Sequence, residues 1–308
     1  MGQSTFFEAC SLEPSVAPTV GMETEFIEFR GGGEIGPVLE RLEAFRPQVT
    51  VVFRPDVFPA GALHDVPGAL LGFLTEPLPR QGRKAVRHPD LDRRLADLGA
   101  IDPLNVDRVV CFDPKSVPSA EKFVSVWRAL PLPVADRYYR PVGAPVLDPK
   151  ALFVGRSTPH REKYLSRARE SGELLHLAFG VDADHLQQLM AEYPIAINVH
   201  NEPYPTFENR ASLHLAAGQL LISEGLSPSH GLEGGIDFLV AGDGDVLAGI
   251  LDRIRHLPTA WHDVRLRGRR KAELFRASHV YPRLFFDLLN DLHSRPSERP
   301  GAARELVA

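Results

Sequence analysis

Polar side chains are concentrated between two expected strands in the second half of the chain, Ile195 to Val199 and Leu220 to Ile222. The polar residues of this stretch are His200, Asn201, Glu208, Asn209 and Arg210. Asn-Glu-Pro and Tyr-Pro signal a loop, because the residue before a proline is pushed out of the helical region. Thr206 is the expected N-cap of the alanine-rich helix that follows. A helix N-terminus at the rim of a sheet offers free N–H groups, which suits a phosphate or a diphosphate.

A glycine and an arginine stand directly after another expected strand, Ala151 to Val154. Gly155 lets a ligand approach the backbone there, and Arg156 can fork onto diphosphate oxygens. Arg161 and Arg210 can join Arg156 at the same edge. Each arginine alone is compatible with a surface ion pair, but three positive charges that converge on one loop edge favour an anion site.

The sequence GGGEIG, Gly31 to Gly36, satisfies the G-x-G-x-x-G pattern between an expected strand, Thr24 to Phe29, and a helix expected from Pro37. Asp56 lies twenty residues beyond the last glycine, as in the fingerprint of dinucleotide-binding folds. The strand is polar, however, and Pro37 restricts the conformation of the third glycine. A glycine loop or a turn is favoured over NAD or FAD binding, and a nicotinamide-dependent Rossmann enzyme stays open as an alternative.

The histidines and cysteines lack the spacing of a metal site. His200, His214 and His230 form no H-x-x-x-H or H-E-x-x-H pair, and Cys10 and Cys111 are far apart. Zinc would therefore need tertiary convergence of separate segments. No G-x-S-x-G elbow occurs, which argues against a serine hydrolase. The sequence predicts neither a metal nor a cofactor.

Composition narrows the partners and the compartment. The chain has 308 residues and a formal net charge of -5, without a long basic run. This charge argues against nucleic acid and anionic membranes as partners. No signal-peptide pattern opens the sequence and no apolar run reaches the length of a membrane span, which together predict a cytoplasmic protein.

Expected strands alternate with expected helices, the pattern of an α/β fold with mainly parallel sheets. Prolines crowd residues 131 to 149 and mark a domain boundary. We expect a Rossmann-like domain over residues 1 to 145, a second α/β domain over residues 146 to 293 and a disordered tail over residues 294 to 308. Other expected elements are strands Val49 to Phe53, Ala69 to Thr75, Val109 to Phe112, Leu174 to Ala178 and Ile236 to Val240, and helices Leu91 to Leu98, Ser119 to Leu130, Glu162 to Glu170, Ala183 to Glu192 and Val246 to Arg255.

Several of these segments, in this order, resemble the C-terminal half of GT-B glycosyltransferases of the group-1 kind, most closely the shorter spore-maturation-protein-like (CgeB-like) subgroup. The matching segments are FVGR at Phe153 to Arg156, INVH at Ile197 to His200, ENR and LAAG within Glu208 to Gly218, LLISE at Leu220 to Glu224 and GLEGGIDFLV at Gly231 to Val240. The resemblance covers roughly residues 151 to 292. It implies a GT-B fold, with two Rossmann-like domains facing a central cleft, and sugar transfer from a nucleotide-sugar donor, UDP-sugars included, to an unknown acceptor.

In this family the C-terminal domain holds the sugar nucleotide and the N-terminal domain holds the acceptor. The resemblance implies a metal-independent, retaining reaction in which basic side chains stabilise the departing diphosphate. The implied donor-binding residues are Gly155, Arg156, His200, Asn201, Asn209, Arg210, Ser223, Glu224, Gly225 and Leu226. The catalytic candidates are Glu208 and, at a strand end of the N-terminal domain, Glu76; His64 is the next candidate.

The sequence departs from the broader family at one position. The family's E-x7-E motif places a glutamate five residues before the A-x-G glycine, and Leu213 stands there in this chain. Glu208 and Glu224 are the alternatives for the missing ribose-binding carboxylate. A non-catalytic sugar-nucleotide-binding protein of the same fold therefore stays open as a further alternative, and homo-oligomerisation is left open too.

Overall fold

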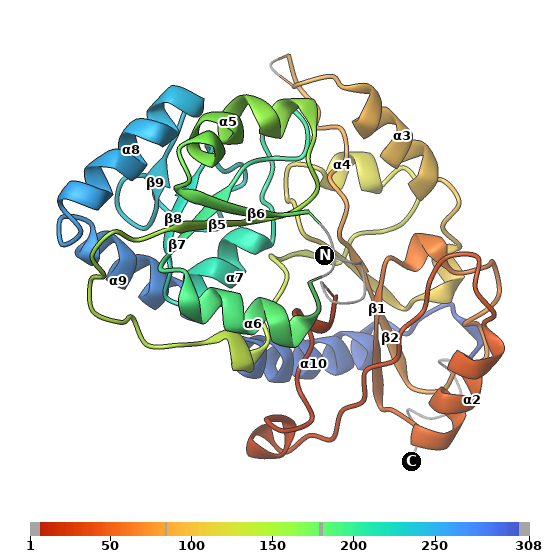
Figure 1. The fold of residues 1–308 in the computed structure, drawn as a ribbon. Coiled ribbons are helices and arrows are strands. Elements are labelled where there is room, and N and C mark those ends of the chain that lie inside the picture. Colours follow the sequence, from red (N-terminus) through yellow and green to blue (C-terminus); the bar gives the residue numbers. More distant parts are fainter. Residues whose placement is uncertain (1–6, 84, 179–180, 302–308) are drawn as a thin grey trace. The chain divides into compact units, whose positions relative to one another are not determined.

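The computed structural model describes residues 7 to 83, 85 to 178 and 181 to 301. The chain forms two compact units, each built on its own parallel sheet (Figure 1). Unit 1 comprises Met1–Leu12 and Pro133–His279, and unit 2 comprises Glu13–Leu132 and Val280–Ala308. The chain therefore passes between the units three times, whereas the sequence predicted a single boundary after residue 145.

Unit 1 contains a five-stranded parallel sheet with the strand order β6-β5-β7-β8-β9. Its strands are β5 (Ala151–Val154), β6 (Leu174–Leu177), β7 (Ile195–Asn198), β8 (Leu220–Ser223) and β9 (Leu239–Val240). Its helices are α5 (Pro159–Glu170), α6 (Ala183–Glu192), α7 (Arg210–Ala216), α8 (Gly244–His256) and α9 (His262–Lys271). The predicted bounds of β5 and α6 are confirmed.

Two cores cover the two faces of this sheet. Successive strand residues point to opposite faces, so Leu152 and Leu221 pack with residues of α6 and α7. Phe153 and Ile222 pack with residues of α5 and α8 on the other face. The strands β5, β7 and β8 are buried along their whole length, as continuous apolar runs in a doubly covered sheet should be.

Unit 2 contains a four-stranded parallel sheet with the order β1-β2-β3-β4. Its strands are β1 (Val49–Phe53), β2 (Ala69–Leu74), β3 (Arg108–Cys111) and β4 (Arg128–Ala129). Its helices are α2 (Gly36–Phe45), α3 (Pro89–Leu98), α4 (Val117–Ala120) and all but the first turn of α10 (Ala277–Ser294). Short 3-10 helices are η1 (Ala17–Val20), η2 (Pro55–Val57) and η3 (Pro103–Asn105) here, and η4 (Asp136–Tyr138) and η5 (Ala272–Phe275) in unit 1.

Two elements expected in this half are wrong. Residues 24 to 29 form no strand, although all of them are described. An alternating sequence pattern becomes a strand only where it pairs with another strand, and these residues belong to neither sheet. The helix expected from Ser119 to Leu130 ends at Ala120. The end of that stretch joins the sheet instead as β4, and just before it the Trp127 N–H donates to the Val109 carbonyl at 2.8 Å. Tertiary pairing here overrides the local helical pattern.

The segment expected to be disordered contributes a buried side chain as far as it is described. Arg299 Nε donates to Asp107 Oδ1 at 3.0 Å and its Nη2 donates to Asp107 Oδ2 at 3.1 Å. The same guanidinium donates to the carbonyls of Val66 and Gly68. A polar tail stays disordered when it has nothing to bury, but Asp107 gives this one a partner inside unit 2. Residues 302 to 308 lie outside the described residues.

None of the helices in the described part of the chain has the length and apolar character that a membrane crossing needs.

Candidate functional site

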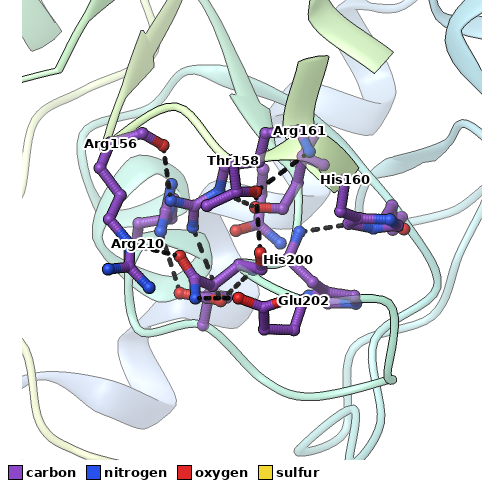
Figure 2. A network of polar contacts seen from close by, with 12 residues as sticks. Arg156, Thr158, His160, Arg161, His200, Glu202 and Arg210 are labelled. Carbon is purple, nitrogen blue, oxygen red and sulfur yellow. Dashed lines mark hydrogen bonds and ion pairs between the residues drawn. The ribbon is translucent and has the colours of Figure 1, made fainter. Parts of the chain in front are cut away.

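The predicted donor-binding residues gather at one edge of the unit 1 sheet. The strands β5, β7 and β8 run parallel, so the residues after their carboxyl ends share that edge. These residues are Gly155 and Arg156 after β5, His200 and Asn201 after β7, and Glu224 and Gly225 after β8. Figure 2 shows the resulting network of polar contacts, which also includes Thr158, His160, Arg161, Glu202 and Arg210.

Two arginine side chains meet beside Gly155. A Cβ atom on this glycine would lie 2.8 Å from Nη1 of Arg210 and 3.3 Å from Nη1 of Arg161. Both guanidinium groups also lie over the ring of Phe153, at 5.1 Å for Arg210 and 5.3 Å for Arg161. A Cβ atom here would have to displace the Arg210 guanidinium, which glycine leaves in place.

Arg161 is held in place by backbone carbonyls. It lies in the first turn of α5, where Thr158 is the N-cap and accepts a hydrogen bond from the Arg161 N–H at 3.2 Å. Its Nε donates to the Val199 carbonyl at 3.1 Å and its Nη1 to the Arg156 carbonyl at 3.0 Å. The residue is only 2 % exposed. Burial, and then the charge of Arg210, lower its pKa to about 9, so Arg161 still carries a positive charge at neutral pH.

Glu208 is the counter-ion of both arginines. Its Oε2 accepts from Arg210 Nη2 at 2.9 Å, and its Oε1 lies 3.8 Å from Arg161 Nη2. The backbone N–H of Asn201 donates to the same Oε1 at 3.1 Å. Burial alone would raise the pKa of Glu208, but Arg210 and Arg161 outweigh it and hold the pKa at about 2. The carboxylate therefore stays ionised throughout the physiological range.

Acid is expected to remove this ion pair's contribution to stability. The fall in the pKa of Glu208 from 4.5 to about 2 corresponds to about 3 kcal/mol at neutral pH. A lowered carboxylate pKa stabilises the fold above the unfolded value and loses that effect as the pH falls towards about 2. Denaturant unfolding of unit 1 across this range should show the wild type converging with a Glu208→Gln variant. A stability difference that does not change with pH contradicts the expectation.

Arg156 is the most exposed of the three guanidinium groups. Its Nε donates to Asn201 Oδ1 at 2.9 Å. Thr158 Oγ1 donates to the Asn201 carbonyl at 2.9 Å, so the loop after β7 is tied to the loop after β5. One exposed and two more buried positive charges therefore lie along the same edge, where guanidinium groups can donate to diphosphate oxygens.

A second group of contacts surrounds Glu224. His160 Nε2 lies 2.9 Å from Glu224 Oε1, and the His200 N–H donates to Oε2 at 2.6 Å. Ser223 turns inward, where its Oγ donates to the Glu224 carbonyl at 2.7 Å and accepts from Asn198 Nδ2 at 2.8 Å. The His200 ring contacts the Gly225 carbonyl through Nε2 at 3.2 Å. Glu224 and His200 thus share the edge with the arginines, while the Ser223 hydroxyl lies within the protein.

Two expectations about the α7 region need correction or comment. Thr206 is not the N-cap, because α7 begins at Arg210 with Asn209 before it, and Asn209 makes no side-chain capping bond. Phe207 is buried in the core and Glu208 is paired with the arginines, which delays the start of the helix. Leu213 is buried in the same core, so the position of the family glutamate is apolar in space as well as in sequence.

The remaining catalytic candidates lie in unit 2. Glu76 Oε1 lies 2.9 Å from Arg54 Nη1, and its Oε2 pairs with Arg94. His64 Nε2 lies 2.8 Å from Asp102 Oδ2. The structure therefore places Glu76 in an ion-pair network of unit 2.

The glycine-rich stretch Gly31 to Gly36 lacks the surroundings of a dinucleotide site. It follows irregular residues instead of a strand, and its last glycine is the first residue of α2. Asp56, the expected ribose ligand, pairs with Arg54 at 2.7 Å. Among the residues that the structure describes, no three His, Cys, Asp or Glu side chains gather as metal ligands would.

Two residues of the network were missed in the sequence. Thr158 precedes Pro159, a signal for a helix start, and it places the beginning of α5 three residues before the expected Glu162. The partnership of His160 with Glu224 spans 64 residues and has no local signal.

No protein-family model matches the sequence, and no curated protein matches it. Solved structures share its fold. HepE from Anabaena in complex with UDP-glucose aligns over 90 % of this chain and 88 % of that chain, with a TM-score of 0.57 and 11 % identity. AviGT4, a glycosyltransferase involved in avilamycin A biosynthesis, aligns over 87 % and 81 %, with a TM-score of 0.52 and 14 % identity. Sucrose-phosphate synthase from Thermosynechococcus elongatus aligns over 86 % and 82 %, with a TM-score of 0.51 and 16 % identity. The predicted α/β fold of the GT-B type is thereby confirmed.

Proposed function

We propose that this GT-B-fold protein is a glycosyltransferase that moves a sugar from a nucleotide-sugar donor to an acceptor. The observation that carries this is the convergence of Arg161 and Arg210 beside Gly155. Open α/β sheets bind ligands at the carboxyl ends of their strands, and paired guanidinium groups at such an edge suit a diphosphate. HepE, which shares the fold, has been crystallised with UDP-glucose, and this supports a UDP-sugar as the donor.

The residues at the edge account for the electrostatics of the transfer. As the bond between the anomeric carbon and the diphosphate oxygen breaks, negative charge collects on the leaving diphosphate. Arg156 and Arg210 lie where they can donate to its oxygens, and Arg161 adds a fixed positive charge from inside the fold. The acceptor oxygen forms the new bond to the anomeric carbon, and its proton passes to an oxygen of the departing diphosphate. This route needs no metal ion, and we assign it retention at the anomeric carbon.

We assign the acceptor to unit 2 and the donor to unit 1. The other donor contacts that we propose are His200, Asn201, Asn209, Ser223, Glu224, Gly225 and Leu226. Their place after β7, before α7 and at or after the carboxyl end of β8 supports them, although the Ser223 hydroxyl itself is bonded within the protein. The resemblance to the CgeB-like subgroup also supports this division. Both predicted catalytic carboxylates, Glu76 and Glu208, are engaged in ion pairs in the structure, and of the two we keep Glu76 as the candidate that touches the reacting atoms.

A non-catalytic sugar-nucleotide-binding protein is the second candidate. The buried Leu213, where the wider family has a glutamate, favours it. The nicotinamide alternative has less support, because Gly31 to Gly36 follows no strand.

A ligand panel is expected to separate these three functions. UDP and UDP-glucose should raise the melting temperature while NAD and NADH leave it unchanged, because only a ligand that binds the folded state stabilises it. Incubation with a set of nucleotide sugars and candidate acceptors should then release free nucleotide. A melting shift without release identifies a binder. A rise in melting temperature with NADH alone contradicts the glycosyltransferase. So does a melting temperature that none of the nucleotides raises.

A further inference from the structure

We propose that Glu208 is a built-in counter-ion that tunes the charge of the diphosphate site, so that it favours a doubly charged donor over the more highly charged nucleotide product. This inference rests on the proposed function and assigns Glu208 a specificity-determining role. Glu208 acts through the two arginines and does not touch the reacting atoms.

The geometry ties Glu208 to the arginines and to the backbone at once. Its carboxylate contacts Arg210 Nη2 at 2.9 Å and lies 3.8 Å from Arg161 Nη2. The Asn201 N–H fixes Oε1 at 3.1 Å. A carboxylate with this third anchor is part of the built site, whereas a carboxylate on a free loop would simply be displaced by an incoming anion.

Both arginines also donate hydrogen bonds to backbone carbonyls, so their guanidinium groups stay in place if Glu208 moves. Arg210 Nη1 donates to the Val154 carbonyl at 3.1 Å. Arg161 Nε donates to the Val199 carbonyl at 3.1 Å. The positive charges are therefore held in place by the sheet edge, and the charge of Glu208 is subtracted from theirs.

The charge of Glu208 opposes the charges of the arginines. Arg156, Arg161 and Arg210 contribute one positive charge each, and Glu208, which contacts two of them, removes one. Glu202 and Glu224 also place carboxylates at this edge, but these contact Asn201 and His160. A nucleoside diphosphate sugar carries about two negative charges, and a free nucleoside diphosphate about three, because its terminal phosphate loses a second proton near pH 6. Without Glu208 the site would be more positive by one charge and would hold the more highly charged product more tightly.

The test compares Glu208→Gln with the wild type by calorimetric titration with inorganic diphosphate, UDP and UDP-glucose. We expect the variant to bind inorganic diphosphate and UDP about tenfold more tightly, since one opposing charge has gone from a poorly solvated site. UDP-glucose should gain less, so the preference for UDP over UDP-glucose rises. The variant should at the same time be less stable without ligand, a combination that a purely structural role does not produce.

A matched control is Glu192→Gln, which removes the same charge from the exposed end of α6 in the same unit. It should leave all three affinities unchanged. Weaker or unchanged binding of diphosphate by Glu208→Gln overturns the inference, as does an unchanged ratio of UDP to UDP-glucose affinity.

The two proposals fail separately. A wild type that releases UDP from a donor, paired with a variant that binds no anion more tightly, overturns the counter-ion and leaves the glycosyltransferase standing. Tighter binding with the altered ratio in the variant, but no turnover by the wild type with any donor, supports the counter-ion and overturns the glycosyltransferase. A wild type that binds neither diphosphate nor nucleotide overturns both.

Discussion

Replacing Arg299 by methionine is expected to destabilise unit 2 by about 3 to 5 kcal/mol. The side chains of Arg299 and Asp107 are both 0 % exposed, and they form a two-pronged ion pair across the unit. Methionine would fill much of the volume but leave the Asp107 carboxylate buried without its positive partner. Asp107 Oδ2 also accepts the Leu70 N–H at 2.6 Å, so the loss would reach β2 directly.

Amide hydrogen exchange in β2 and β3 is the suitable measurement, because a protein with two units need not unfold in one step. The control is Arg295→Met. Arg295 is 76 % exposed in its pair with Asp291, and its loss should change the free energy of unfolding by less than about 0.5 kcal/mol. Equal protection of β2 and β3 in both variants would mean that the chain beyond α10 contributes nothing to unit 2.

Replacing Arg210 by methionine is expected to weaken UDP binding about 100-fold. The guanidinium lies at the carboxyl end of β5, where a diphosphate would receive two hydrogen bonds from it. Hydrogen bonds to charged groups are each worth about 1.5 to 3 kcal/mol, and a loss of about 3 kcal/mol is about 100-fold in affinity. Arg210→Lys keeps the charge but not the fork, so its loss should be intermediate.

Titration of both variants with UDP measures this effect, and a melting curve confirms that each is folded. Arg167→Met is the matched control, because Arg167 also lies in unit 1, on α5, and its side chain is 66 % exposed beside Asp245. UDP affinity should be unchanged in that control. If Arg210→Met binds UDP as tightly as the wild type, the diphosphate does not lie at this edge.

The sheet of unit 1 could be read from the sequence because its strands are short apolar runs separated by loop signals. Residues Ala151 to Val154 and the helix from Ala183 to Glu192 carry these signals and were placed correctly. The gathering of Arg156, Arg161 and Arg210 at one edge also followed, since parallel strands deliver the residues after them to the same side of a sheet.

What the sequence did not reveal depends on pairing between distant segments. The stretch from Thr24 to Phe29 alternates like a strand but belongs to neither of the two sheets. Trp127 to Leu130 reads as helix and pairs with β3 instead. Arg299 and Asp107 are separated by 192 residues, so no local window contains the reason why Arg299 is buried. The partnership of Glu208 with two arginines was equally invisible, because a carboxylate in a loop reads as a ligand contact or as a solvated charge.

The route of the chain through the two units sets the order in which they can be completed during translation. Unit 1 has all of its segments once residue 279 has left the ribosome. Unit 2 begins to form from residue 13 but receives its buried arginine only when residue 299 emerges. Most of unit 2 is therefore synthesised before most of unit 1, but unit 2 is completed later. Until residue 299 emerges, Asp107 lacks its buried arginine partner.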